Sequence, residues 1–269
     1  MKRLPIRKKR SRKPAGYRKM LGVDTNAKTI KESGAKKIKG KKRGKHLIGI
    51  LYLAPSDTSG VMNTCGNETD GCKSTCLFKQ GRAAIHKSIN IARINKTLFL
   101  HANPAAALAS LAWDIEGLIF RARKLKLKPA VRINGTSDIP KIARELAIMF
   151  PEVIFYDYTK HPRPWLRELD NYKITFSHSE ENLQDCLQAL TWGVNVAVVF
   201  DTKKGKPLPE TWWGYPVIDG DTHDKRFLDP KTVVVGLRAK GTAKKDCSGF
   251  VVRVNQQPLI NISQMKNVA

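Results

Sequence analysis

The chain has 269 residues, with 49 Lys and Arg against 23 Asp and Glu, so its formal net charge is +26 and its pI is near 10.1. Apolar residues make up 41% of it, which is enough for a hydrophobic core and excludes a wholly disordered protein. No apolar run reaches the roughly 18 residues that a membrane-spanning helix needs, and the basic N-terminus lacks the apolar part of a secretory signal. We therefore expect a basic, cytoplasmic protein without membrane contacts.

The first 45 residues form a basic arm, with 19 Lys and Arg but only two acidic residues. Because the arm has little apolar periodicity, we expect residues 1–45 to be largely disordered and residues 46–269 to form the folded domain. Such a charge density favours a nucleic-acid partner, DNA or RNA, since binding releases counterions from the phosphates; a solubilising tail is the alternative. The residues expected to contact nucleic acid are Lys8, Lys9, Arg10, Arg12, Lys13, Lys41, Lys42 and Arg43.

After the arm, β-rich runs alternate with amphipathic stretches. Strands are predicted at residues 47–53, 130–134, 153–157, 173–177, 195–201, 216–219, 232–237 and 249–254. Helices are predicted at 83–101, 104–127, 139–150 and 180–192. Repeated strand–helix–strand order indicates a mainly parallel α/β fold. The number of strands favours a full or partial (β/α) barrel over an open sheet.

Polar residues follow nearly every predicted strand. In parallel α/β folds the carboxyl ends of the strands meet on one side, where catalytic residues gather. We therefore expect these polar ends to form one shared site. The residues expected to line its substrate mouth, as catalytic candidates, are Asp157, His178, Asp201, Asp219, Asp221 and His223.

Three of the five cysteines, Cys65, Cys72 and Cys76, follow the first predicted strand with the spacing C-x6-C-x3-C. An odd cysteine count does not indicate a disulfide scaffold, and clustered thiols in a reducing compartment indicate a metal site. One interpretation is a [4Fe–4S] cluster with one open iron, and another is a closed zinc site. The fourth ligand of such a zinc site would be His86, His46 or Cys247. A third interpretation is that the three are small buried side chains without a metal.

A cysteine loop after the first strand of a parallel barrel resembles the radical S-adenosylmethionine enzymes. The segment VRINGTSDIP is also similar to the Gly-Gly-Glu strand end of that superfamily, although the cysteine spacing differs from its usual C-x3-C-x2-C. The resemblance implies a partial barrel with an iron–sulfur cluster at its mouth and S-adenosylmethionine chelating the open iron. The residues that it implies as cofactor contacts are Asn134, Gly135, Thr136, Ser137 and Asp138.

A second resemblance covers most of the chain, from about residue 22 to residue 254. The segments LYLAPSDTSGVMNTCGN, FYDYTK and VIDGDTHDKRFLD are similar to an uncharacterised family of gene products carried by phages and plasmids. This resemblance implies a protein of a mobile element in the host cytoplasm, and it brings no established activity.

An acidic cluster, DGDTHD, supplies Asp219, Asp221, His223 and Asp224. Oxygen ligands of this kind hold Mg²⁺ or Mn²⁺ in enzymes that cleave phosphodiesters. The structural alternative is an Asp-rich turn with salt bridges to Lys225, Arg226 and Arg238.

Three functional hypotheses follow from the sequence. The leading one is an iron–sulfur protein, similar to the radical S-adenosylmethionine enzymes, that acts on nucleic acid or binds it. The second is a non-catalytic nucleic-acid-binding protein with a structural zinc or iron–sulfur site. The third is a metal-dependent nuclease that uses the acidic cluster.

Overall fold

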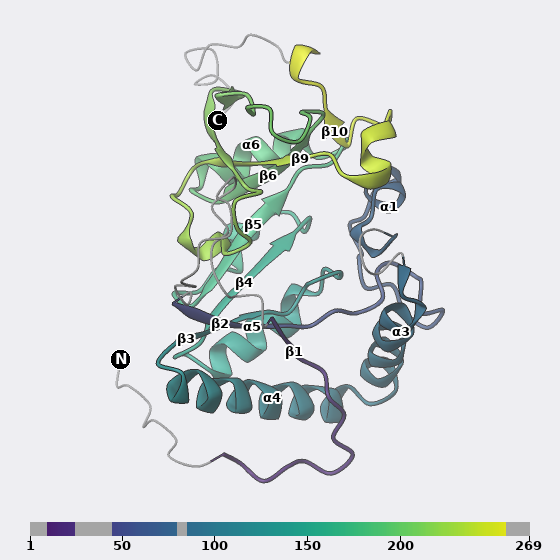
Figure 1. Ribbon diagram of the computed structural model, residues 1–269, viewed down its shortest axis with the longest axis vertical. Coiled ribbons are helices and arrows are strands. Elements are labelled where there is room, and N and C mark those ends of the chain that lie inside the picture. Colours follow the sequence, from purple (N-terminus) through teal and green to yellow (C-terminus); the bar gives the residue numbers. More distant parts are fainter. Residues whose placement is uncertain (1–9, 25–44, 80–84, 257–269) are drawn as a thin grey trace, which may run out of the picture.

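The computed structural model describes residues 10–24, 45–79 and 85–256 (Figure 1). Its strands are β1 (Gly22–Asp24), β2 (His46–Ile50), β3 (Lys128–Arg132), β4 (Ile154–Thr159), β5 (Tyr172–Ser177), β6 (Asn195–Phe200), β7 (Thr211–Trp212), β8 (Tyr215–Asp219), β9 (Val234–Arg238) and β10 (Val251–Val252). Its α-helices are α1 (Asp70–Ser74), α3 (Lys87–Ala102), α4 (Pro104–Lys124), α5 (Pro140–Met149) and α6 (Leu183–Thr191). The strands and longer helices predicted after residue 46 are thus confirmed, with ends shifted by a few residues.

The strands form one mixed sheet in the order β1-β2-β3-β4-β5-β6-β9-β8-β7, and β10 pairs with β6. The strands from β2 to β8 in this order run parallel to their neighbours. The edge strands β1 and β7 are antiparallel to β2 and β8. The carboxyl ends of the parallel strands therefore lie along one side of the sheet.

The predicted full or partial parallel barrel, similar to that of the radical S-adenosylmethionine enzymes, is wrong. A barrel closes when its first and last strands pair, whereas this sheet ends in β1 on one side and β7 on the other. Two further features differ from a (β/α) barrel. β9 inserts between β6 and β8, and the connections from β6 to β10 contain only loops and short 3₁₀ turns, so the second half lacks the outer helices of a (β/α) barrel.

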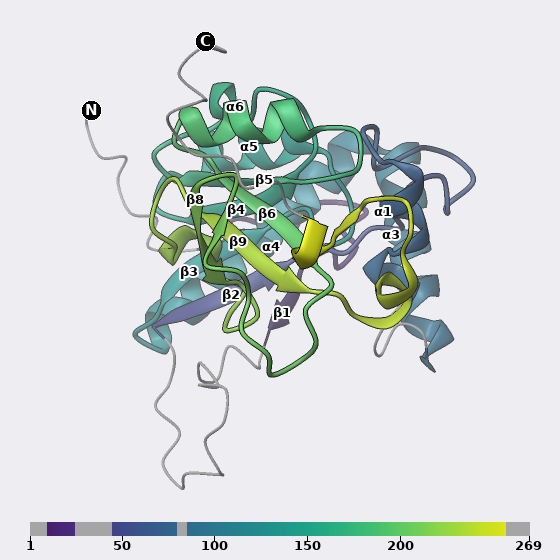
Figure 2. The ribbon, with the colours of Figure 1, turned by 90° about the horizontal axis from the view of Figure 1, so that it is seen from above.

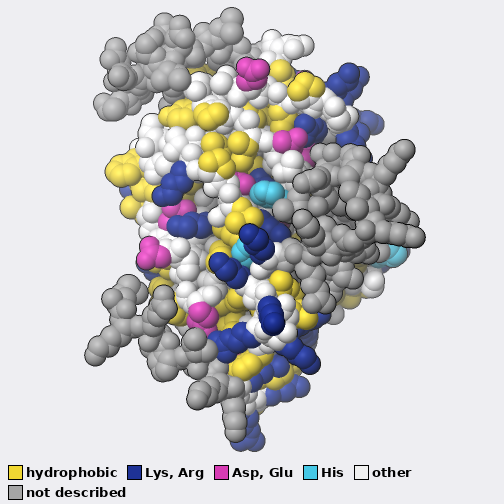
Figure 3. Space-filling view, turned by 60° about the vertical axis from the view of Figure 1, so that its left-hand side comes forward, with side chains coloured by type: hydrophobic (Ala, Val, Ile, Leu, Met, Phe, Trp, Pro, Cys, Tyr) yellow, Lys and Arg dark blue, Asp and Glu magenta, His cyan; other side chains and the backbone are white. Residues whose placement is uncertain are grey.

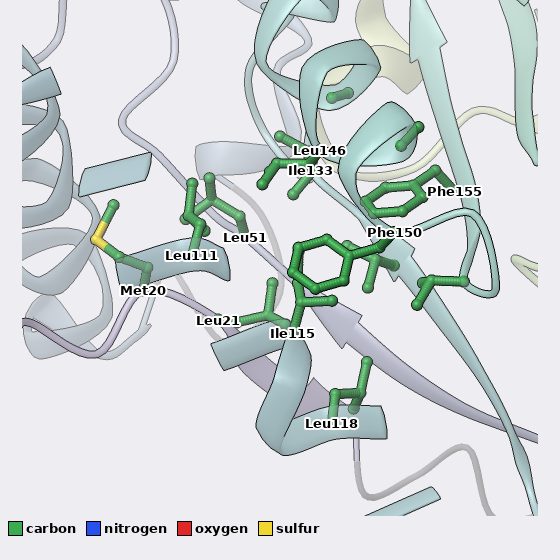
Figure 4. Close-up of a cluster of buried hydrophobic side chains, with 14 of the residues drawn as sticks. Met20, Leu21, Leu51, Leu111, Ile115, Leu118, Ile133, Leu146, Phe150 and Phe155 are labelled. Carbon is green, nitrogen blue, oxygen red and sulfur yellow. The ribbon is translucent and has the colours of Figure 1, made fainter. Parts of the chain in front are cut away.

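The three helices α4, α5 and α6 pack on one face of the sheet, and Figure 2 shows α5 and α6 on that side. Apolar side chains of α4 and α5 meet those of β2 to β5 in the larger core cluster. Figure 4 shows Leu111 and Ile115 of α4 in this cluster with Phe155 of β4. A second cluster joins α6 to β5, β6 and β9. The long apolar runs in the sequence are thus explained by burial under helices. None of the described helices is long and apolar enough to cross a membrane.

Residues 10–24 pack against α4, so this part of the expected disordered arm is ordered. Met20 and Leu21 are almost fully buried in the larger core cluster, and β1 extends the sheet beside β2. The backbone N–H groups of both residues donate to the carboxylate of Asp114 on α4, at 2.9 Å each. The burial of these two apolar residues helps to fix the segment, and the buried carboxylate satisfies their backbone N–H groups. The other positions of the expected arm, 1–9 and 25–44, lie outside the described residues.

Candidate functional site

A cavity of about 850 Å³ lies at the carboxyl ends of the parallel strands, on the face of the sheet opposite α4, α5 and α6. Its floor consists of residues that alternate with the core residues of each strand, including Arg132, Tyr158, Ser177, Val199 and Leu237. Its walls come from the loops that follow β2, β3, β4, β8 and β9. This is the position at which ligands bind in parallel α/β proteins.

The cavity brings together many of the candidates from the sequence. All five expected cofactor contacts, residues 134–138, line it, as do Cys65, Cys72 and Cys76. Among the catalytic candidates, His178, Asp221 and His223 line it. The structure places Asp157, Asp201 and Asp219 outside the lining.

Asp157 stabilises the turn formed by residues 134–138 through hydrogen bonds to Asn134. Its carboxylate accepts the backbone N–H of Asn134 at 2.7 Å, the side-chain amide of Asn134 at 3.1 Å and the hydroxyl of Tyr172 at 3.3 Å. Complete burial raises the pKa of Asp157 to about 7. Asp157 therefore positions the cavity wall.

Gly135 is the tightest point of this turn. A Cβ at this position would lie 2.7 Å from the carbonyl oxygen of Leu51 and 2.7 Å from the ring of Tyr52. Glycine is therefore required because the turn crosses the end of β2 in close contact. The backbone N–H of Gly135 donates to that same carbonyl oxygen at 3.0 Å.

The three cysteines line one cavity but do not form a metal centre. Within the described residues, no group of three His, Cys, Asp or Glu could hold a metal ion. Burial raises the pKa of the Cys65 thiol to about 11 and also raises that of Cys76, so both are protonated thiols when no metal is bound. The predicted [4Fe–4S] cluster, its zinc alternative and the S-adenosylmethionine bound to it are therefore wrong.

The expected fourth zinc ligands lie elsewhere. His46 begins β2 and packs edge-to-face on Phe227, whereas His86 precedes α3 and Cys247 is exposed near the C-terminal end of the described residues. None of the three lines the cavity. The three cysteines therefore line one cavity, but none of the three residues expected as the fourth ligand lies beside them.

His178, which directly follows β5, is a buried polar group in the cavity wall. The residue is only 8% exposed, and its ring packs edge-to-face on Trp212. Its Nδ1 atom is buried and has no hydrogen-bond partner in the described structure. Burial, together with the nearby positive charge of Lys160, lowers the pKa of His178 to about 4, so the imidazole is neutral at pH 7. A neutral ring with an unpartnered nitrogen can bond a polar group of a ligand.

Lys160 is a cavity residue that sequence reasoning did not select. It follows β4, and its amino group lies 5.4 Å from the ring centre of Phe250, which lines the same cavity. Among the described residues, no acidic side chain forms an ion pair with the Lys160 amino group, so no carboxylate of these residues neutralises its charge by direct contact. The sequence signal was its place at the polar strand end FYDYTK, but a lone lysine among many basic residues gave no reason to choose it.

The carboxylates of the acidic cluster at the end of β8 form salt bridges with Arg and Lys side chains. Arg238 donates to Asp219 at 2.9 Å and to Asp221 at 3.1 Å, and Lys240 also pairs with Asp221 at 2.7 Å. Asp224 pairs with Arg132 at 2.6 Å across the cavity floor. These carboxylates do not fit a Mg²⁺ or Mn²⁺ site, because their oxygens already bind guanidinium and ammonium groups. Of the salt-bridge partners expected for this turn, Arg238 is the one that pairs with Asp219 and Asp221.

The remaining candidates have structural contacts. Asp201 accepts the backbone N–H of Val254 at 3.1 Å and lies 3.7 Å from Arg253. His223 lies 3.1 Å from the guanidinium of Arg226, and burial and this charge lower its pKa.

Of the expected nucleic-acid contacts that the structure describes, two lie against aromatic rings. The guanidinium of Arg10 lies 3.1 Å from the ring centre of Trp113 on α4, and Lys13 lies over Tyr17. Arg12 is exposed. The other expected nucleic-acid contacts, namely Lys8, Lys9, Lys41, Lys42 and Arg43, lie outside the described residues. Figure 3 shows Lys and Arg side chains gathered at the lower end of one face, the end at which α4 lies in Figure 1.

Comparison with known proteins gives one match. A family model described as Gene product 88 matches residues 19–253. No curated protein and no solved structure matches the chain. The match agrees with the resemblance to phage-type gene products, whereas the resemblance to radical S-adenosylmethionine enzymes gains no support from it.

Proposed function

The chain belongs to the Gene product 88 family, and from this premise we propose that its cavity binds one nucleotide of a nucleic acid. One observation carries the proposal. Lys160, whose amino group has no ion-pair partner among the described residues, lines the same cavity as His178, a neutral imidazole whose buried Nδ1 atom has no hydrogen-bond partner among them. The amino group suits a phosphate, and the imidazole can form a hydrogen bond with an N–H group of a base or with a sugar hydroxyl.

The size and lining of the cavity suit such a ligand. Its volume of about 850 Å³ lies within the range of sites for small organic ligands. Phe250, Tyr158, Val199 and Leu237 contribute aromatic and apolar side chains to the lining, against which a base can pack. The net charge of +26 favours a polyanion over a neutral metabolite as the partner.

The test is calorimetric titration with a nucleoside and with its 5′-monophosphate, in both the ribose and the deoxyribose series. We expect the monophosphate to bind about tenfold more tightly than the nucleoside, because a hydrogen bond to a charged group contributes about 1.5 kcal/mol or more. Lys160→Gln should remove this difference, and His178→Phe should weaken both ligands to a similar extent. Lys128→Gln, at an exposed position at the opposite end of the sheet, is the matched control and should leave both affinities unchanged.

Equal affinities for the nucleoside and the monophosphate, or no binding of either, would exclude the proposal. So would a monophosphate preference that persists in Lys160→Gln.

A further inference from the structure

A second hollow adjoins the cavity. This groove, of about 520 Å³, lies between the loop after β2 and the start of α5, and Asp138 lines both it and the cavity. Met62, Ile139 and Pro140 give it an apolar surface. Its basic residues are Lys141, Arg144, His161 and Arg167. The groove therefore lies next to the cavity, with Asp138 in the wall of both.

The charge of the groove is positive. Its single carboxylate, that of Asp138, accepts the hydroxyl of Thr159 and the backbone N–H of Lys160, both at 2.7 Å. Arg167 donates only to the backbone carbonyls of Pro162 and Arg163 in the contacts of the described chain. Within the same residues, neither Lys141 nor Arg144 forms an ion pair. Three cations therefore surround one groove without a carboxylate that neutralises them.

We propose that this groove binds the phosphate backbone of a single-stranded nucleic acid, one nucleotide of which enters the neighbouring cavity. The inference rests on the proposed function, since it names the form of the same ligand. A base that enters the cavity must leave its stack and its pairing partner, and this costs least in a single strand. The cations of the groove then meet the adjacent phosphates, and the apolar surface meets the sugars.

Fluorescence anisotropy with a labelled single-stranded oligothymidylate tests the inference. The double variant Lys141→Glu/Arg144→Glu reverses two exposed charges. The matched control Arg121→Glu/Lys124→Glu makes the same change in net charge in the last turn of α4, within the basic region at the other end of the molecule. We expect the groove variant to bind roughly tenfold more weakly and its salt slope to fall by roughly 0.7 for each cation removed, and we expect little change in the control.

A mononucleotide titration of the same groove variant separates the two proposals and reports on its folding. If the groove variant binds the mononucleotide as tightly as the wild type does, its cavity is intact. If the groove variant no longer binds the mononucleotide, the oligonucleotide titration is repeated with Lys141→Gln/Arg144→Gln. The inference is overturned if the control variant weakens oligothymidylate as much as the groove variant does, or if duplex DNA binds as tightly as the single strand. In both cases mononucleotide binding can persist, so the proposed function stands. If mononucleotides fail to bind while the salt slope still depends on the groove, it is the proposed function that fails.

Discussion

The carboxylate of Asp157 accepts the backbone N–H of Asn134 at 2.7 Å, and this contact joins β4 to the cavity wall. Asp157 sits on the helix-covered face of the sheet, whereas the turn that it holds opens into the cavity on the other side. A carboxylate that the sequence suggested as a catalytic group thus supports the backbone of residues that line the cavity.

Asp157→Asn should change the pH dependence of stability. The pKa of Asp157 is about 7 in the folded protein and near 3.8 in the unfolded chain, so the folded state binds more protons between these values. Stability from this group is therefore complete below about pH 4 and is lost as the pH rises towards 7. Urea unfolding at several pH values should show that this loss, roughly 2–4 kcal/mol in the wild type, is absent from the variant. If the free energy of unfolding has the same pH dependence in the wild type and in Asp157→Asn, the raised pKa of Asp157 is contradicted.

Gly135→Ala should destabilise the protein and weaken mononucleotide binding. The added methyl group would overlap the carbonyl of Leu51 and the ring of Tyr52, and such overpacking costs roughly 1–3 kcal/mol. Gly66→Ala is the control, because a Cβ at that position in the cysteine loop has no neighbour within 4 Å. Thermal unfolding and calorimetry should distinguish the two variants, and equal melting temperatures would show that the turn can move.

His178→Phe should reduce the loss of stability in acid. The pKa of His178 is about 4 in the folded protein against 6.5 in the unfolded chain, so the folded state binds fewer protons in this window. Stability therefore rises with pH through the window and is lost as the pH falls from 6.5 to about 4. Phenylalanine keeps the packing on Trp212 and does not titrate, so the fall in melting temperature on acidification should be smaller than in the wild type. An unchanged fall would mean that the imidazole is not buried.

Asp114→Ala should release the N-terminal segment from α4. The substitution leaves the buried N–H groups of Met20 and Leu21 without their acceptor and also removes the contact with the Tyr17 hydroxyl. The expected cost is roughly 2–4 kcal/mol, and trypsin should cut sooner after Arg18 and Lys19. Glu116→Ala is the control, since Glu116 accepts hydrogen bonds from Ser11, near the start of the described segment, and not from Met20 or Leu21. Equal rates of cleavage in the two variants would show that Asp114 is not the anchor.

Much of the fold could be read from the sequence, because alternation and apolar runs are local properties. The runs around Val131, Phe155 and Val198 predicted the central strands, and the polar residues after them predicted a site at the carboxyl ends. Residues 134–138 and His178 do line one cavity for this reason. The prediction of a metal site failed, because spacing in a loop does not determine where the Sγ atoms of Cys65, Cys72 and Cys76 come to lie.

The sequence by itself determined which segments become strands and helices, which strand ends are polar, and that the protein is strongly basic. Only the tertiary structure decided that β9 lies between β6 and β8, that Asp114 fixes residues near Met20, and that Arg238 neutralises Asp219 and Asp221. The physical reason is the range of the interactions. Helix and strand preferences depend on neighbours along the chain, whereas strand order and ion pairing depend on groups that meet only when distant segments fold together.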